Sequence, residues 1–281
     1  MTVKIVTDSL SDITSDIAEE LGITVVPLTV LFGHETFLDR VTMTTDQFYH
    51  RLTRDSVWPT TTQPTPAAFI EVYNELAKET DEILVVTLSS KLSGTYQSAL
   101  GARSMFEGKC RIEIIDSKLV AMGLGLIVIT TAKKAQAGAK LNELTGAVVS
   151  ALPRSHIAIY LDTLKYLAKG GRIGKAQGLL GSMLSVKPIL TIKEGEIAPL
   201  TRMRSLSAGM DYLYNFAAGF ANIEELAVEH ATTPDAADRL VERLGSLFPK
   251  ERIYQSTISP VVGTYAGPDA LAITVLEAAK R

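Results

Sequence analysis

The first half of the chain alternates short apolar runs with amphipathic helical segments. The apolar runs are rich in β-branched residues and predict strands at 4–8, 23–32, 82–88 and 110–115. A first helix is predicted after Thr14 or Ser15 as its cap, with Gly22 as its stop, and further helices are predicted at 44–54, 65–79, 119–137 and 140–152. The run EILVVTL (82–88) does not alternate with polar residues, which is typical of a sheet covered on both faces. The pattern therefore predicts a mostly parallel, doubly wound sheet.

The pattern changes after Pro153. A strand at 156–161 is followed by a helix that ends at Gly170–Gly171, and 188–202 predicts two strands around a Glu194–Gly195 turn. We expect the rest to form a helix at 206–220, a strand at 225–230, a helix from 234, a strand at 252–258 and a closing segment at 268–280. The fold class is α/β, with two α/β domains at 1–153 and 154–281 and a mixed second sheet. A ligand site is expected in the crevice between them.

Composition narrows the class of protein. Of the 281 residues 46% are hydrophobic and 21% are charged, as in a soluble globular protein, and the net charge of −3 gives no reason to expect nucleic acid or an anionic membrane as partner. The single Cys110 excludes an intrachain disulfide and suits a reducing compartment. The longest apolar stretch, 119–130, is short and interrupted by glycine, so we expect a helix buried between layers. We found no signal peptide and expect a cytoplasmic protein that is not a membrane protein.

Familiar catalytic and cofactor motifs fail on inspection. GGRIGK (170–175) lacks the spacing of a phosphate loop, and GLG (123–125) lacks the third glycine of a dinucleotide fingerprint. No serine lies in a G-x-S-x-G motif, and the four histidines have no metal-ligand spacing. We therefore expect a binding protein with no metal, no cofactor and no catalytic residue.

Two clusters of hydroxyl residues, LSSKLSGTYQSA (88–99) and PTTTQPTP (59–66), lie at predicted helix starts. The carboxyl end of a strand and the next helix N-terminus form the usual ligand shelf of such sheets, and both favour an anion. Gly94 would let the backbone approach a ligand closely. Ser93 and Thr61 have an alternative role as helix caps, which use the same residue types, and spacing alone favours that role.

Two charged residues near these clusters have open roles. Asp8, at the end of the first strand, is expected to orient hydroxyls or hold loops together, because a bare carboxylate would repel an anionic ligand. Arg172 follows a helix end and would reach the first domain, where it would bind a carboxylate or phosphate, or pair with an acidic residue.

A set of longer motifs covers nearly the whole chain: TDSLSD (7–12), VPL (26–28), TTTQPT (60–65), LSSKLSGTYQSA (88–99), DSKLVAMGLG (116–125), LKYLAKGGRIGKAQG (164–178), KPILTIKEGEIAP (187–199) and GTYAGPDALA (263–272). In this order they resemble the DegV family of bacterial fatty-acid-binding proteins. The resemblance implies a long-chain fatty acid, such as palmitate, buried between two α/β domains.

The resemblance also implies which residues bind the ligand. The carboxylate would be held by Thr61 and Ser93, with Thr62 and Gly94 nearby, and the family's Gly-Gly-Arg motif ends at Arg172. Two positions depart from the family motif G-T-H-T-G-P-G: Tyr265 replaces its histidine and Asp269 its last glycine. A tyrosine hydroxyl still donates a hydrogen bond, but it carries no positive charge near neutral pH.

By the same resemblance the chain would be a non-catalytic subunit that presents its acyl carboxylate to a separate fatty acid kinase, which makes an acyl phosphate for lipid synthesis. An alternative is a small-molecule hydrolase or acyl transferase with Ser93 as nucleophile. That alternative lacks an evident base, since Tyr265 occupies the position where one would be expected. A third alternative is a regulatory or scaffolding protein with a vestigial crevice.

Overall fold

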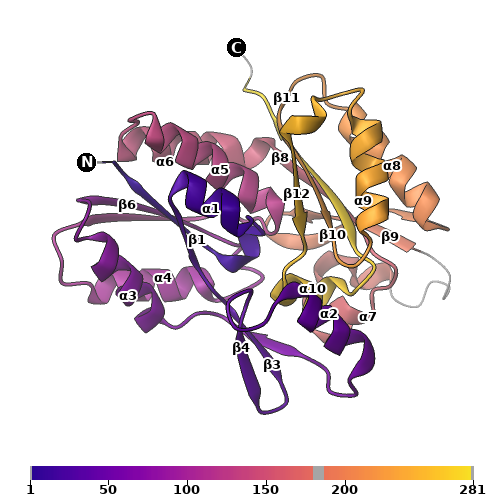
Figure 1. Ribbon diagram of the computed structural model, residues 1–281, viewed down its shortest axis with the longest axis horizontal. Helices are drawn as coiled ribbons and strands as arrows, with labels where there is room; N and C mark the ends of the chain where they lie inside the picture. Colours follow the sequence, from indigo (N-terminus) through magenta and orange to yellow (C-terminus); the bar gives the residue numbers. More distant parts are fainter. Residues whose placement is uncertain (1, 180–186, 280–281) are drawn as a thin grey trace.

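The computed structural model describes residues 2–179 and 187–279, which form two α/β lobes (Figure 1). We call residues 2–151 the N-terminal lobe and residues 155–279 the C-terminal lobe. The predicted fold class is confirmed. The predicted domain boundary falls on a short 3-10 helix, Leu152–Arg154, and stays a prediction.

The N-terminal lobe is built on a parallel sheet in the order β2-β1-β6-β7. Its strands are β1 (Lys4–Asp8), β2 (Ile23–Val26), β6 (Glu82–Thr87) and β7 (Arg111–Asp116). Helices α3 (Pro66–Leu76) and α4 (Thr95–Met105) cover one face, and α1 (Ser15–Leu21), α5 (Met122–Gln136) and α6 (Leu141–Ala151) cover the other. Both faces are covered, so the prediction from the unbroken apolar run at 82–88 is confirmed.

The predicted strand at 23–32 is wrong as a single element. Its first part is β2, and its second part, β3 (Thr29–Phe32), joins a separate antiparallel sheet in the order β4-β3-β5. The break falls at Pro27, which has no N–H to donate to a sheet, and the next N–H, of Leu28, donates to Ser9 Oγ at 3.1 Å. The partner strands β4 (Glu35–Leu38) and β5 (Thr60–Thr62) were not predicted. Helix α2 (Thr45–Arg54) begins at the predicted capping box of Thr44 and Gln47.

The C-terminal lobe contains a six-stranded mixed sheet in the order β10-β9-β8-β13-β11-β12. Its strands are β8 (Ser155–Tyr160), β9 (Lys187–Lys193), β10 (Glu196–Met203), β11 (Ile223–His230), β12 (Ile253–Thr257) and β13 (Leu271–Glu277). Only β11 and β12 pair in parallel among the described strands of this sheet. Helices α8 (Leu206–Ala218) and α9 (Pro234–Leu244) pack on one face. The closing segment is mostly β13, and its residue 280 lies outside the described residues.

Helix α5 lies between the two main sheets. It contacts β1 and β6 on one side and β8, β11 and β13 on the other, and its residues 122–132 are all buried. The prediction of a helix buried between layers is thus confirmed. Among the described residues, no helix combines the length and the apolar character needed to cross a membrane.

Two short helices of the C-terminal lobe, α7 (Lys165–Lys169) and α10 (Pro260–Ala266), pack on each other, and α10 also contacts the N-terminal lobe. Helix α10, which was not predicted, contacts α2, β3 and β5 across the lobe boundary.

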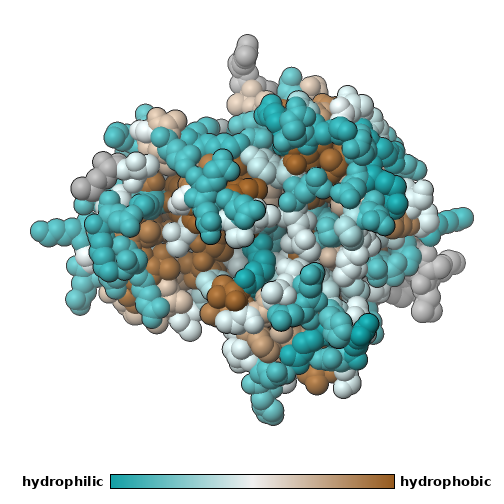
Figure 2. Space-filling view, viewed as in Figure 1, coloured by the Kyte–Doolittle hydropathy of each residue, from teal (hydrophilic) through white to brown (hydrophobic). Residues whose placement is uncertain are grey.

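The outer face in Figure 2 is mostly hydrophilic, with hydrophobic side chains showing between α1 and α3 over the edge strand β2. The apolar contact between lobes lies inside the molecule, among the buried residues that join both sheets into one core.

Candidate ligand pocket

An apolar pocket lies between the two lobes. It encloses about 890 Å³ between atoms, part of it open to solvent. Both lobes contribute aliphatic side chains to its lining, including Leu10, Leu28, Leu88, Ile159, Leu190 and Val261. Polar side chains line it mainly in one group, formed by Thr61, Gln63, Ser93, Arg172 and Tyr265, which we call the headgroup cluster.

Strand β5 aims Thr61 at the pocket. Its neighbour in the pairing register is Val30 of β3, which is fully buried, so this face of the small sheet points inward. Thr60 and Thr62 flank Thr61 and are exposed, because successive side chains of a strand point to opposite faces. Thr61 Oγ1 and the hydroxyl of Tyr265 are 2.5 Å apart, which joins β5 to α10 of the other lobe.

The two hydroxyl-rich segments meet at Gly94. A Cβ placed there would lie 2.7 Å from Nε2 of Gln63, so the loop before α4 packs directly on the loop after β5. The close neighbour of Gly94 in this structure is thus the side chain of Gln63, and the predicted approach of its backbone to a ligand stays a prediction. The hydroxyl of Ser93 lies 2.9 Å from that of Thr95.

Neither proposed ligand residue caps a helix. Helix α3 is capped by Thr65, whose Oγ1 accepts a hydrogen bond from the Ala68 N–H at 3.3 Å. Helix α4 begins at Gly94, with no side-chain cap. The capping alternative is thus wrong for Thr61 and Ser93, and both side chains line the pocket instead.

Arg172 closes the headgroup cluster from the C-terminal lobe. Its Nε donates to the carbonyl of Leu92 at 3.3 Å, its guanidinium also donates to the carbonyl of Gly170, and its charge lies 5.3 Å from the ring centre of Tyr265. The predicted reach to the first domain is confirmed. The partner is a carbonyl, so the alternative of an ion pair with an acidic residue is wrong for this structure. A side chain at Gly170 would clash with the Tyr265 ring.

Asp8 holds loops together, as expected. Its two carboxyl oxygens accept from the N–H groups of Leu10 at 3.1 Å and Leu88 at 2.7 Å, which ties the end of β1 to the end of β6. Burial raises the pKa of Asp8 to about 7. The loop that carries Ser93 starts directly after Leu88, so this carboxyl helps to place the ligand shelf.

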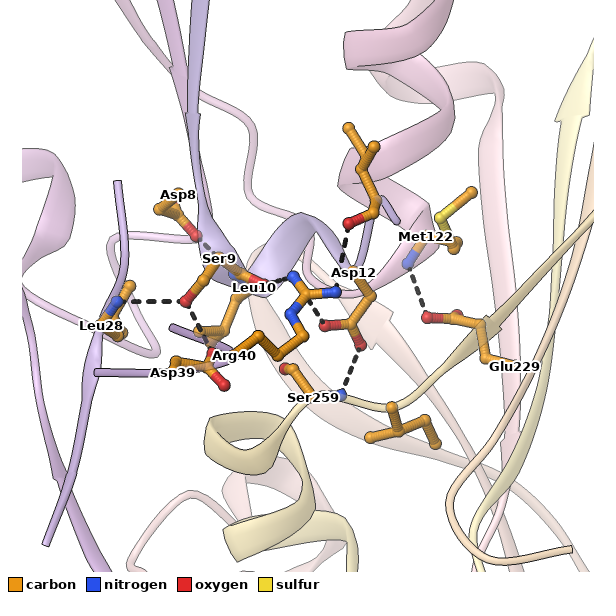
Figure 3. A network of polar contacts seen from close by, with 12 residues as sticks. Asp8, Ser9, Leu10, Asp12, Leu28, Asp39, Arg40, Met122, Glu229 and Ser259 are labelled. Atoms are coloured by element: carbon orange, nitrogen blue, oxygen red, sulfur yellow. Dashed lines mark hydrogen bonds and ion pairs between the residues drawn. The ribbon is translucent and has the colours of Figure 1, made fainter. Parts of the chain in front are cut away.

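A buried acidic cluster lies beside the pocket and was missed in the sequence. Asp8, Asp12, Asp39 and Glu229 are buried, and Arg40 is the cation that lies among them (Figure 3). Desolvation raises the pKa of Asp39 to about 7, and desolvation together with the charge of Asp12 raises the pKa of Glu229 well above its usual range. Only Glu229 of these four belongs to the pocket lining.

Backbone oxygens also hold the guanidinium of Arg40. It donates to the carbonyls of Ile13 and Ser9 at 3.1 and 2.7 Å and lies 4.0 Å from the Asp12 carboxylate. Sequence spacing gave no signal for this cluster, because residues 8–12, 39–40 and 229 come together only through the fold. Gln63 lay within the motif TTTQPT and could have been singled out.

No group of three or more His, Cys, Asp or Glu side chains in the described ranges is arranged to hold a metal ion. Ser93 has the hydroxyl of Thr95 as its hydrogen-bond partner, so its nearest polar neighbour is not a base. Cys110 is partly buried just before β7, and burial raises the pKa of its thiol.

Comparisons with known proteins agree on one family. A family model described as an uncharacterised protein family, DegV, matches residues 2–278. A DegV domain-containing protein of Caldanaerobacter subterraneus subsp. tengcongensis is 38% identical over 275 residues, which cover 96% of this chain and 97% of the relative.

Solved structures agree with that result. One, described as showing fatty acid binding of a DegV family protein from Thermus thermophilus, has a TM-score of 0.90 and 30% identity over 99% of this chain and 100% of that chain. Another, described as DegV, a fatty acid binding protein from Bacillus subtilis, has a TM-score of 0.87 and 29% identity over 99% of this chain and 100% of that chain.

Proposed function

The chain belongs to the DegV family, and we propose that it is a long-chain fatty-acid-binding protein that buries the acyl chain between its lobes. Two structurally similar relatives are described as binding fatty acids. The observation that carries the proposal is the shape of the pocket: an aliphatic lining from both lobes with a cluster of hydroxyl and amide groups.

The energetics suit such a ligand. Burial of a methylene group contributes about 0.8 kcal/mol, so a 16-carbon chain gains roughly 10 kcal/mol before ordering costs are subtracted. Each hydrogen bond to a charged carboxylate adds about 1.5–3 kcal/mol. The tail would dominate affinity, and the headgroup cluster would fix the orientation of the ligand.

The headgroup cluster gives each residue a distinct role. The hydroxyls of Tyr265 and Thr61 share a hydrogen bond in which either can be the donor. With the Tyr265 O–H as donor, the hydroxyl of Thr61 is free to donate to the carboxylate. Ser93 donates from the opposite loop, and Gly94 brings that loop close to Gln63. Thr62 follows Thr61 on β5, but its exposed side chain lies on the other face of the strand, away from the pocket. Arg172 places its positive charge over the ring of Tyr265.

We further propose that the protein performs no chemistry of its own on the acid. It would present the carboxylate to a separate fatty acid kinase, which forms the acyl phosphate with its own ATP and metal. Headgroup residues that come from loops, from the short edge strand β5 and from the short helix α10 support this presentation. The proposal places the protein in the cytoplasm, where ATP is available to the partner.

Lipid extraction followed by mass spectrometry tests the binding proposal. Protein purified without added lipid, together with a detergent-stripped sample reloaded with palmitate, should yield close to one fatty acid per chain. A stripped protein that takes up no fatty acid of any chain length would overturn the proposal and favour a scaffold.

Turnover assays test the non-catalytic part. Purified protein incubated with acyl esters or acyl phosphates should release no fatty acid above the background rate. Turnover that disappears in Ser93→Ala would instead assign a nucleophile to the pocket.

A further inference from the structure

Two carboxyl groups meet across the lobe boundary beside the pocket. Asp12 lies after β1 in the N-terminal lobe, Glu229 lies on β11 of the C-terminal lobe, and both side chains are fully buried. Figure 3 shows them facing each other, and the two groups share a side-chain hydrogen bond. An ionised carboxylate only accepts hydrogen bonds, so this contact requires one proton between the two groups. We call Asp12 and Glu229 the carboxyl pair.

Each member of the carboxyl pair also accepts a backbone N–H from the opposite lobe. Oδ2 of Asp12 accepts from Ser259, just before α10, at 3.4 Å. Oε1 of Glu229 accepts from Met122, at the start of α5, at 3.1 Å. Together with the shared proton, these contacts join the lobes in both directions at one place. The place borders the pocket, because Glu229 is one of its lining residues.

The surrounding charges place the shared proton on Glu229. Asp12 lies 4.0 Å from the guanidinium of Arg40, and this positive charge stabilises the ionised form of Asp12. Burial and the negative charge of Asp12 raise the pKa of Glu229 well above its usual range. The pair with its proton carries one negative charge, which Arg40 balances.

Further titratable groups face the pair from the N-terminal lobe. Burial raises the pKa of Asp8 on β1 and of Asp39 after β4 to about 7, and it raises the pKa of Tyr49 on α2 well above its usual range. Ionisation of Asp8 and Asp39 adds negative charge, which favours the proton of the pair, so we expect the pair to lose its proton last among these carboxyl groups. The neighbours of the pair on β12, β13, α5 and the segment before α10 have no titratable side chain: Ser256, Ala272, Met122 and Ser259.

We propose that the carboxyl pair is a proton-dependent latch between the lobes, which keeps the pocket closed around a bound acyl chain. This inference rests on the proposed function. With its proton, the pair forms a charge-assisted hydrogen bond across the boundary. Without the proton, two negative charges lie against each other in a buried place, where they repel more strongly than in water. Loss of the proton at alkaline pH therefore loosens the lobes and speeds release of the ligand.

The test measures palmitate release and lobe opening between pH 6 and 10. Transfer of bound palmitate to an excess of fluorescently labelled albumin gives the release rate. In ligand-free protein the emission of Trp58, the single tryptophan, reports on the boundary, because Trp58 stacks on Tyr166 of the other lobe with ring centres 4.9 Å apart. Wild-type release should accelerate about tenfold or more from neutral to alkaline pH, and Trp58 emission should change over the same range.

Two variants remove the like-charge pair. In Glu229→Gln the amide donates to Asp12 and its carbonyl accepts from Met122, so the latch has no proton to lose. Asp12→Asn removes the repulsion from the other lobe. In both variants the release rate should change by less than about twofold over the pH range. Asp39→Asn is the matched control, because it removes a buried carboxyl of the same cluster and leaves the carboxyl pair intact, so it should keep the acceleration.

Wild-type data alone can overturn the latch. A release rate that stays constant from pH 6 to 10 contradicts it, whatever the variants do, and so does an acceleration that persists in folded Glu229→Gln or Asp12→Asn. If neither variant folds, infrared spectra of the wild type decide. The last protonated-carboxyl band should disappear as release accelerates, and a band that is lost before the acceleration begins contradicts the latch.

Failure of the proposed function has a different signature. Wild type that binds no palmitate at any pH would overturn fatty-acid binding, but it would leave the Trp58 titration of ligand-free protein as a test of the latch. A pH-dependent change in Trp58 emission that Glu229→Gln abolishes supports the latch, and equal changes in wild type and Glu229→Gln contradict it.

Discussion

Tyr265 and Thr61 come from opposite lobes and share one hydrogen bond at the headgroup cluster. A tyrosine in this place is neutral, so orientation of the carboxylate relies on donated hydrogen bonds and on the nearby charge of Arg172. The arrangement also explains why a side chain at Gly170 is excluded, since it would occupy the space of the Tyr265 ring.

Removal of either proposed donor should weaken fatty-acid binding without unfolding the protein. Thr61→Ala and Ser93→Ala each delete a half-buried hydroxyl and should raise the Kd for palmitate about ten- to a hundredfold, because hydrogen bonds to a charged group are worth roughly 1.5–3 kcal/mol. Thr60→Ala is the control, since its exposed side chain lies on the other face of β5. Titration of stripped protein with palmitate gives the affinities, and an unchanged Kd in the double variant would remove both residues from the site.

The buried carboxyl of Asp39 should make stability depend on pH. Burial raises its pKa from 3.8 to about 7, so the folded state favours the protonated form. Its contribution to the free energy of unfolding is full below about pH 4 and is lost as pH rises to about 7, by as much as about 4 kcal/mol. Asp39→Asn keeps an acceptor for the Ser9 hydroxyl and removes this titration.

Urea unfolding of wild type and Asp39→Asn between pH 4 and 8 measures the effect. The wild type should lose stability relative to the variant as pH rises, and the difference should level off above pH 7. Parallel curves over the whole range would show that Asp39 does not titrate with a raised pKa.

At the scale of elements, the loop before α4 and the loop after β5 form one unit through Gly94 and Gln63. Gly94→Ala should separate these loops and weaken palmitate binding several-fold, because the packed side chain of Gln63 stands where the methyl group would go. The fold should survive, since Gly94 lies at the start of a helix with ordinary backbone angles.

Gly146→Ala provides the matched control for Gly94→Ala. Gly146 lies inside helix α6 with open space where a methyl group would go, and alanine there should add about 0.5–1 kcal/mol to stability with no effect on binding. Thermal unfolding and palmitate titration of both variants separate the two effects. Normal palmitate affinity in Gly94→Ala would show that the contact with Gln63 does not shape the site.

The sequence predicts the elements whose signals are local. The Thr44–Gln47 capping box, the Glu194–Gly195 turn and the apolar run at 82–88 all lead to the observed helix, hairpin and buried strand. The small sheet and α10 escape prediction because their stability comes from partners far away in the chain, such as Val30 for β5. The run at 23–32 misleads because apolar pattern does not show that Pro27 redirects the chain into a second sheet.

The site residues, too, were predicted where the sequence carried a recognisable motif and missed where only the fold brings them to the pocket. Thr61, Ser93 and Tyr265 were expected together through motif resemblance, and the fold brings them to one pocket. Glu229 lies in an unremarkable strand pattern, LAVEH, so nothing local shows that its face of the sheet borders a pocket. Its pairing with Ala272 decides that, and strand pairing over such separations is a property of the fold.

At the scale of the whole molecule, the pocket is the place where a single ligand would contact both lobes. Its lining draws on Leu10 and Leu88 from one lobe and on Ile159 and Leu190 from the other. A ligand that binds only the folded state raises stability by an amount that grows with ligand concentration, about 2.7 kcal/mol at one hundred times Kd. Because one acyl chain would contact both lobes, its binding should stabilise both lobes against unfolding.

Hydrogen exchange measures this coupling directly. Palmitate should slow amide exchange in the segment 88–94 and in β5 of the N-terminal lobe, and also in α10 and β13 of the C-terminal lobe. Local opening of either lobe would expose the bound acyl chain to water, so the ligand opposes opening of both. Amides of α9, which packs on the far face of the mixed sheet, are the internal control and should change less. Protection limited to one lobe would place the ligand on a single domain, since a chain buried between lobes cannot leave one of them free to open.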